Sequence, residues 1–244
     1  MLRTTRANVS VLCAALLIAA MAPVALADVI VFQCDFEDAE GYALGGLDGQ
    51  QGWTADVDAV VQDANASSGV QAAQMTANGP EVPDGMLMMR HGFANPLPMY
   101  DVTVTQDVAF SHLYQANWAV ALMAGEEFVN VVTFTWTGEI LVDYAATPYT
   151  WVPATWETLR VDLDFSLGTL EVYYGANILA SKPISLTSPA LGCDSVAVFT
   201  DNYADEPNSM FYDNLLVQAI PEPATMVLLG LGLFGIAVRR TRSR

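Results

Sequence analysis

The chain has 244 residues, with 27 Asp and Glu against 9 Lys and Arg, and a formal net charge of −18 at pH 7. So negative a balance disfavours nucleic acid and anionic membrane surfaces as partners and favours cations and neutral or basic polymers. With only two histidines, His91 and His112, a three-histidine metal site is excluded.

The amino end has the pattern of a secretory signal peptide. Arg3 and Arg6 precede an apolar stretch over residues 9–22, and Ala25-Leu26-Ala27 is a small-x-small cleavage site. Residues 1–27 are therefore predicted to form a signal helix that is cut before Asp28. A retained helix is the less favoured alternative, because Pro23 interrupts the apolar run.

Residues 28–219 are predicted to form one exported domain, which is long enough for a single core. Six of the nine basic residues lie in the terminal segments, as does one carboxylate, Glu222. The domain therefore keeps 3 basic residues, Arg90, Arg160 and Lys182, against 26 carboxylates, a net charge of −23.

The hydrophobic pattern of this domain is that of β-strands. Apolar residues alternate with polar ones in residues 101–110 and again in 156–165, which is the period of a half-buried strand. Glycine and proline punctuate the segments between such runs, and no window keeps a helical period. The predicted strands are 29–36, 70–76, 86–91, 102–110, 117–124, 128–136, 139–144, 156–165, 169–174, 195–200 and 210–218. This number of short strands predicts an all-β, two-sheet antiparallel sandwich.

A Trp-led strand, residues 156–164, runs into the hairpin sequence Gly168-Thr169-Leu170-Glu171-Val172-Tyr173-Tyr174-Gly175. This stretch resembles the concanavalin A-like (laminin-G-like) jelly roll. The opening Asp35-Phe36-Glu37 and the closing residues 211–217 are similar to the first and last strands of such domains. The resemblance implies a jelly-roll sandwich and supplies no function by itself.

The carboxyl end has three parts in a fixed order. Pro221-Glu222-Pro223 is followed by an uncharged apolar run over residues 224–238, and the chain ends with Arg239, Arg240, Arg242 and Arg244. The run would form roughly 22 Å of helix, short for a permanent anchor across about 30 Å of hydrocarbon. The arginines would hold that end on the cytoplasmic side.

Residues 220–244 closely resemble the PEP-CTERM sorting signal of Gram-negative bacterial surface proteins. The resemblance implies a short transmembrane helix and recognition by an exosortase-type membrane transpeptidase at Pro221, Glu222 and Pro223. It also implies removal of the tail, and delivery from the inner membrane to the cell surface, the outer membrane or the extracellular matrix. A plain C-terminal tail anchor is the alternative.

No cofactor is indicated with certainty, and a structural calcium ion is the candidate. Jelly-roll domains resembling this one often bind calcium where the first and last strands meet, and Asp35, Glu37, Asp213 and Asn214 lie on those two strands. Calcium prefers such oxygen ligands. A second oxygen-rich loop, residues 201–206, is the other candidate, and a solvated acidic surface is the alternative to both.

Cysteine usage fits an oxidising compartment. Cys13 leaves with the signal peptide, which leaves Cys34 and Cys193 near the two ends of the domain. Because the first and last strands of sandwiches commonly neighbour each other, a Cys34–Cys193 disulfide is predicted.

A proline-flanked segment carries the candidate ligand-binding aromatics, Tyr149, Trp151 and Trp156. On a surface loop their rings could stack on sugars, whereas the alternative is that they cap the core. Trp53, Trp118 and Trp136 are predicted to be buried.

Catalytic chemistry has little support. His91 and His112 are interpreted as turn or edge residues, and no G-x-S-x-G motif is present. Asp162 and Asp164 share a strand face, yet Arg160 beside them suggests a solvated charge row, and the Glu-x-Asp-x-x-Glu pattern of laminarinase-like enzymes is missing. The glycine pattern from Gly230 to Gly235 matches a dinucleotide fingerprint only formally, because no strand precedes it.

The predicted function is that of an exported cell-surface or exopolysaccharide-matrix protein, structural or adhesive and non-catalytic. A carbohydrate-binding module is the first alternative, and a polysaccharide-active glycosidase or lyase is the second. The predicted partners are the exosortase-type transpeptidase and extracellular polysaccharide.

Overall fold

The computed structural model describes residues 29–56, 58–77, 87–97, 101–113, 116–165, 167–184, 192–200 and 207–220. The predicted signal helix, the predicted span over residues 224–238 and the sorting residues Pro221 to Arg244 lie outside these ranges. In the described parts of the chain, no helix is long and apolar enough to cross a membrane.

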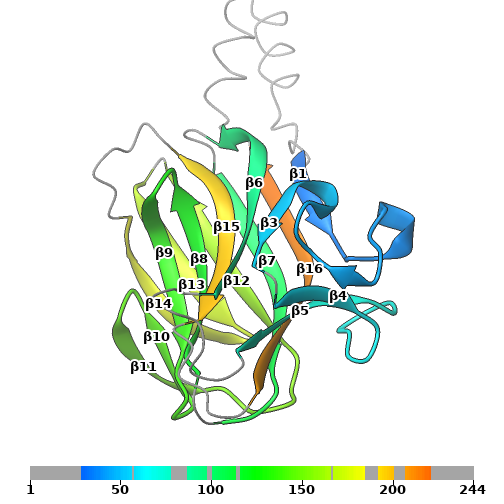
Figure 1. Ribbon diagram of the computed structural model, residues 1–244. Helices are drawn as coiled ribbons and strands as arrows, with labels where there is room; N and C mark the ends of the chain where they lie inside the picture. Colours follow the sequence, from blue (N-terminus) through cyan, green and yellow to red (C-terminus); the bar gives the residue numbers. More distant parts are fainter. Residues whose placement is uncertain are drawn as a thin grey trace, which may run out of the picture.

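Two antiparallel sheets make up the described fold, and they pack face to face (Figure 1). The first, sheet A, has the order β14-β13-β12-β7-β16-β5-β4-β2, with β1 also paired to β16. The second, sheet B, has the order β11-β10-β9-β8-β15-β6-β3. The all-β, two-sheet sandwich predicted from the sequence is confirmed.

The strands are β1 (Val29–Cys34), β2 (Gly45–Gly46), β3 (Trp53–Ala55), β4 (Ala59–Gln62), β5 (Ala72–Ala77), β6 (Leu87–Leu97), β7 (Asp101–Phe110), β8 (Trp118–Ala124), β9 (Glu127–Phe134), β10 (Glu139–Val142), β11 (Ala145–Thr150), β12 (Glu157–Asp164), β13 (Thr169–Tyr174), β14 (Asn177–Pro183), β15 (Cys193–Thr200) and β16 (Asn208–Ile220). Two 3-10 turns, Asp38–Glu40 and Gln50–Gly52, lie between the early strands.

Strand alternation fixes which side of sheet A faces the core. In β12, Leu159, Val161 and Leu163 are buried while the intervening residues are partly exposed. The neighbouring strands follow the same rule, because paired residues point to the same side of a sheet. The outer side of sheet A is therefore polar.

The central strand β8 of sheet B is apolar on both sides. Every residue of β8 is buried, and its alternate residues join two separate clusters. Trp118, Val120 and Leu122 belong to the main core, whereas Ala119 and Ala121 pack with Val131 and Ala197 on the outer side.

The main core contains two aromatic groups. Phe36, Tyr42, Trp53 and Tyr212 form one, with ring centroids 5.2 to 6.2 Å apart. Phe110, Phe134 and Trp151 form the other, with Phe110 4.6 Å from Phe134 and 4.9 Å from Trp151. Aromatic pairs at these distances are attractive beyond the area that they bury.

Strand β16 organises sheet A. It pairs with β7 along most of its length, and on its other side with β5 and then β1. A bulge between Asp213 and Leu216 interrupts the register, and Asn214 has a left-handed φ of 51°. Bulges of this kind redirect side chains, and this one places Asp213 under a neighbouring loop.

Several strands were not predicted from the sequence. β2, β3, β4, β11 and β14 are short or lie near a sheet edge, where the hydrophobic alternation is weak. Residues 147–150 belong to the proline-flanked segment that was predicted as a surface loop, and they instead form part of the edge strand β11. Pro148 in β11 and Pro183 in β14 are compatible with strands only because both strands lie at sheet edges.

Candidate functional site

Three of the four predicted calcium ligands, Glu37, Asp213 and Asn214, meet at one segment, residues 63–71 between β4 and β5, which we call the strap. Asp213 is fully buried beneath it. Its Oδ2 accepts hydrogen bonds from the backbone N–H of Ser67 at 2.9 Å and of Ser68 at 3.2 Å, and its Oδ1 accepts one from the N–H of Asn214 at 2.8 Å. Burial raises the pKa of Asp213 to about 6, against the effect of these donors.

Glu37 holds the end of the strap. Its Oε1 accepts the backbone N–H of Val70 at 2.7 Å and of Gln71 at 3.0 Å. Gly69 lies against this carboxylate with a φ of +61°, and a Cβ at that position would collide with Glu37 Oε1. Only glycine accommodates both the left-handed backbone and the contact.

Asp107 of β7 completes the network. Its Oδ2 accepts hydrogen bonds from Ser67 Oγ and Asn214 Nδ2, each at 2.7 Å, and its Oδ1 accepts one from Thr158 Oγ1 at 2.6 Å. Asn214 Oδ1 in turn accepts a hydrogen bond from Ser68 Oγ at 2.7 Å. Sequence reasoning missed Asp107, because its role depends on the register between β7 and β16.

Hydrogen-bond donors of the protein reach the carboxylates of this network. Both carboxylate oxygens of Asp213 and of Asp107 accept hydrogen bonds from N–H or O–H groups. Over the described ranges, no group of three or more His, Cys, Asp or Glu is arranged to hold a metal ion. The other candidate, residues 201–206, lies outside the described residues.

The predicted disulfide is absent from the structure, where Cys34 and Cys193 are free and buried. They lie on different sheets, Cys34 on β1 and Cys193 on β15. Cys34 Sγ donates to Tyr42 Oη at 3.1 Å, while Cys193 Sγ lies 3.9 Å from the carbonyl oxygen of Ser195. The prediction assumed that both cysteines lie on neighbouring strands, but the strand paired with β1 is β16.

The predicted ligand-binding aromatics are not gathered on an exposed loop. Trp151 is a core residue, 3% exposed, and its Nε1 donates to the carbonyl oxygen of Thr135 at 2.9 Å. Tyr149 packs against the core, and Trp156 is partly buried with its Nε1 donating to Asn65 Oδ1 at 3.0 Å. The alternative reading, in which the rings cap the core, therefore describes Trp151 and Tyr149.

The other tryptophans divide differently from the prediction. Trp53 and Trp118 are buried, as predicted, with exposed fractions of 2% and 0%. The prediction of a buried Trp136 is wrong, because its side chain is 47% exposed at the turn between β9 and β10. The hydrophobic run leading into this tryptophan concealed the turn.

His91 is an interior residue, which corrects its interpretation as a turn or edge residue. It lies on β6 between β3 and β15, and its ring stacks on Phe32 with centroids 3.9 Å apart. Its Nε2 lies 3.1 Å from the carbonyl oxygen of Gln51. Burial lowers the pKa of His91, so the neutral form is favoured. His112, by contrast, follows β7 and lies 2.9 Å from Ser111 Oγ through its Nδ1.

The candidate carboxylate pair of β12 is engaged in local contacts. Asp162 accepts a hydrogen bond from Thr103 Oγ1 at 3.0 Å and pairs with Arg160 Nε at 3.2 Å. Asp164 Oδ1 accepts the N–H of Leu167 at 2.7 Å. These contacts agree with a charge row along the strand.

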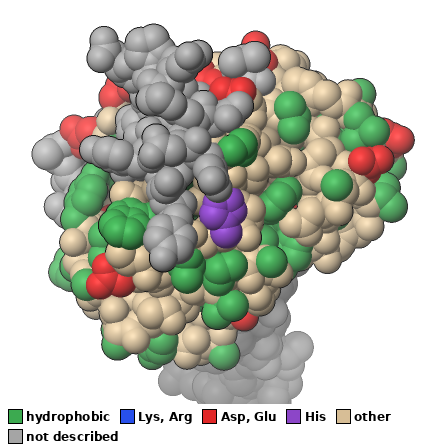
Figure 2. Space-filling view, turned by 60° about the horizontal axis from the view of Figure 1, so that its bottom comes forward, with side chains coloured by type: hydrophobic (Ala, Val, Ile, Leu, Met, Phe, Trp, Pro, Cys, Tyr) green, Lys and Arg blue, Asp and Glu red, His purple; other side chains and the backbone are tan. Residues whose placement is uncertain are grey.

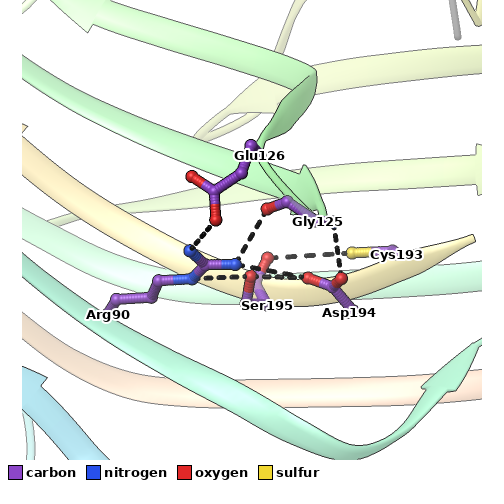
Figure 3. Close-up of polar contacts among 6 residues, drawn as sticks. All are labelled: Arg90, Gly125, Glu126, Cys193, Asp194 and Ser195. Atoms are coloured by element: carbon purple, nitrogen blue, oxygen red, sulfur yellow. Dashed lines mark hydrogen bonds and ion pairs between the residues drawn. The ribbon is translucent and has the colours of Figure 1, made fainter. Parts of the chain in front are cut away.

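Basic groups are scarce and paired. Arg90 donates to Ser195 Oγ at 3.0 Å and to the Gly125 carbonyl at 2.9 Å, and it lies 3.7 Å from both Asp194 and Glu126 (Figure 3). Arg160 pairs with Asp162, and Lys182 of β14 pairs with Asp143 across the two sheets.

All three basic side chains of residues 28–219 therefore have acidic partners. Of the described side chains, Asp and Glu but no Lys or Arg are visible on the face in Figure 2. An anionic sugar would meet uncompensated negative charge here.

One known family model matches the carboxyl end of the chain. Residues 219–242 match the family model for the PEP-CTERM protein-sorting motif. The chain carries a PEP-CTERM motif. No match was found among curated proteins.

Solved structures match the sandwich of this chain at low identity. A carbohydrate esterase from the Shiga toxin-encoding bacteriophage phi24B is 15% identical with a TM-score of 0.55, covering 80% of this chain and all (100%) of that one. An endo-β-1,4-glucuronan lyase from the fungus Trichoderma reesei is 10% identical with a TM-score of 0.52, covering 79% and 96%. A sialidase is 10% identical with a TM-score of 0.52, and the chain spans only 17% of its length. At these identities the matches show the fold alone, and they agree with the concanavalin A-like resemblance.

Proposed function

We propose that this PEP-CTERM protein is a cell-surface or exopolysaccharide-matrix protein of a Gram-negative bacterium, sorted by an exosortase-type enzyme. The observation that carries the proposal is the position of the motif relative to the fold. Strand β16 ends at Ile220, and Pro221 follows at once. Cleavage at the motif would therefore remove the tail without removing a strand from sheet A.

A structural or adhesive role without catalysis is supported by the state of the reactive side chains. His91 is sealed among aromatic rings, and the carboxylates of β12 and of the strap network accept hydrogen bonds from neighbouring groups. A net charge of −23 and three paired basic side chains suit a neutral or cationic matrix polymer rather than a polyuronate.

Carbohydrate binding is the second candidate, and Trp136 is the observation that favours it. An indole that is 47% exposed on a hairpin turn, flanked by the hydroxyls of Thr135 and Thr137, could stack on a sugar ring. A glycan array should then show binding that Trp136→Ala abolishes while the melting temperature stays unchanged. Release of reducing ends or unsaturated products from a polysaccharide panel would instead favour the third candidate, a glycosidase or lyase.

The sorting proposal is tested by fractionation of cells that express three forms of the protein. Wild type should reach the surface or matrix fraction. A form that ends at Ile220 retains the sandwich and should be released into the periplasm or medium. Glu222→Ala should accumulate in the inner membrane with its tail attached. Equal distribution of all three forms would overturn the proposal.

A further inference from the structure

The strap lies over the outer side of sheet A and is held by side chains from three other parts of the chain. Asp213 of β16 accepts the backbone N–H groups of Ser67 and Ser68, and Glu37 accepts those of Val70 and Gln71. Four of the five backbone N–H groups from Ser67 to Gln71, all except that of Gly69, thus donate to two carboxylates. Asp213 is fully buried, so its carboxylate needs these donors, and the hydrogen bonds fix the strap above it.

The carboxylates lack a basic partner. The three basic side chains of residues 28–219 pair with Glu126, Asp194, Asp162 and Asp143, none of which belongs to the strap network. Asp35 lies close enough to Asp213 to oppose its ionisation. Backbone N–H and hydroxyl O–H groups therefore donate to these carboxylates, at the place where a calcium ion was the candidate partner.

We infer that the strap is a cover clamped by Glu37, Asp107 and Asp213 as hydrogen-bond acceptors, and that the clamp closes without a divalent cation. Opening the strap would expose Asp107 and Asp213, whose carboxylates lie beneath Ser67. It would also release the indole of Trp156 from Asn65. The segment is thus a removable lid over an acidic strip of sheet A, and its two carboxylate anchors can be broken one at a time.

Amide hydrogen exchange of the full-length protein separates the two anchors. In Asp213→Asn one side-chain oxygen becomes an N–H₂ donor, so at least one of the three N–H groups loses its acceptor. Exchange at Ser67 and Ser68 should then be about tenfold faster or more, because local opening becomes easier. Glu37→Ala, which removes the acceptor of both N–H groups, should have the same effect at Val70 and Gln71, with a smaller effect at Ser67.

Asp164→Asn is the matched control, since Asp164 accepts a backbone N–H, from Leu167, in a different turn. It should leave the exchange of the strap unchanged. Calcium chloride and a chelator should each change exchange in the wild-type strap by less than about twofold, because the clamp contains no cation. If calcium slows exchange at Ser67 and Ser68 and the chelator accelerates it, the clamp needs a cation and the inference is wrong. Wild-type exchange at Val70 and Gln71 in Glu37→Ala would also overturn it, and this holds even if Asp213→Asn fails to fold.

Discussion

Replacing Trp151 tests whether the aromatic segment belongs to the core or to a ligand site. The indole is 3% exposed, packs on Phe110 with centroids 4.9 Å apart, and donates a hydrogen bond to Thr135 at 2.9 Å. Truncation of a buried tryptophan to alanine costs about 3–5 kcal/mol, which includes the cavity that it leaves. Against a typical stability of about 5–15 kcal/mol, Trp151→Ala should leave a marginal fold.

Urea unfolding at neutral pH measures this loss, with two further variants for comparison. Trp151→Phe keeps an aromatic ring against Phe110 but removes the N–H donor, so it should lose about 1–2 kcal/mol. Trp136→Ala removes an indole that is 47% exposed and should lose less than about 1 kcal/mol. A loss below about 1 kcal/mol in Trp151→Ala, combined with lost glycan binding, would refute the assignment of Trp151 to the core.

Three further predictions concern Gly69, His91 and the two cysteines. Gly69→Ala should destabilise the protein by at least about 1–2 kcal/mol in urea, because its φ is +61° and a Cβ would strike a carboxylate; wild-type stability would contradict the strap geometry. Burial lowers the pKa of His91 below its usual 6.5. As the pH falls below 6.5, the unfolded chain therefore takes up a proton before the folded chain does, and the free energy of unfolding decreases. The fall in unfolding free energy between pH 7 and 5 should therefore be smaller in His91→Gln than in wild type, and equal slopes would refute it. Burial raises the pKa of the Cys34 and Cys193 thiols to about 12, so a thiol reagent should modify them only after unfolding, and a bridged peptide in a non-reducing digest would contradict this.

The sequence pattern of a strand is strong where the two faces of that strand differ in polarity. The alternation in 156–165 correctly predicts β12, because Leu159, Val161 and Leu163 face the core and the residues between them do not. The same signal fails at the edge strands β11 and β14, where proline interrupts a pattern that only tertiary pairing sustains.

The location of the candidate site could be predicted from the sequence, but the partners of its carboxylates could not. Sequence order placed Glu37 and Asp213 on the first and last strands, and the structure brings them to the same segment. Their hydrogen-bond donors are backbone N–H groups of the strap, whose position depends on how the strap crosses the sheet. Local sequence carries no signal for that path, so the oxygens were assigned to a cation instead of to backbone donors.

Cys34 and Cys193 show a related limit. Proximity to the two ends of the domain suggested neighbouring strands, yet the chain leaves sheet B through β15 and returns to sheet A through β16 before it ends. Cys193 lies on β15, one strand before β16, and this places the two thiols in different sheets. The position of a cysteine along the chain does not show to which sheet its strand belongs.

The mass of the C-terminal peptide from the exported protein tests the account most directly. The account predicts a mature chain that begins at Asp28, keeps β16 and lacks Arg239 to Arg244, recovered from the surface or matrix fraction. A surface-exposed protein that still carries its terminal arginines, or a cytosolic product of any length, would contradict it.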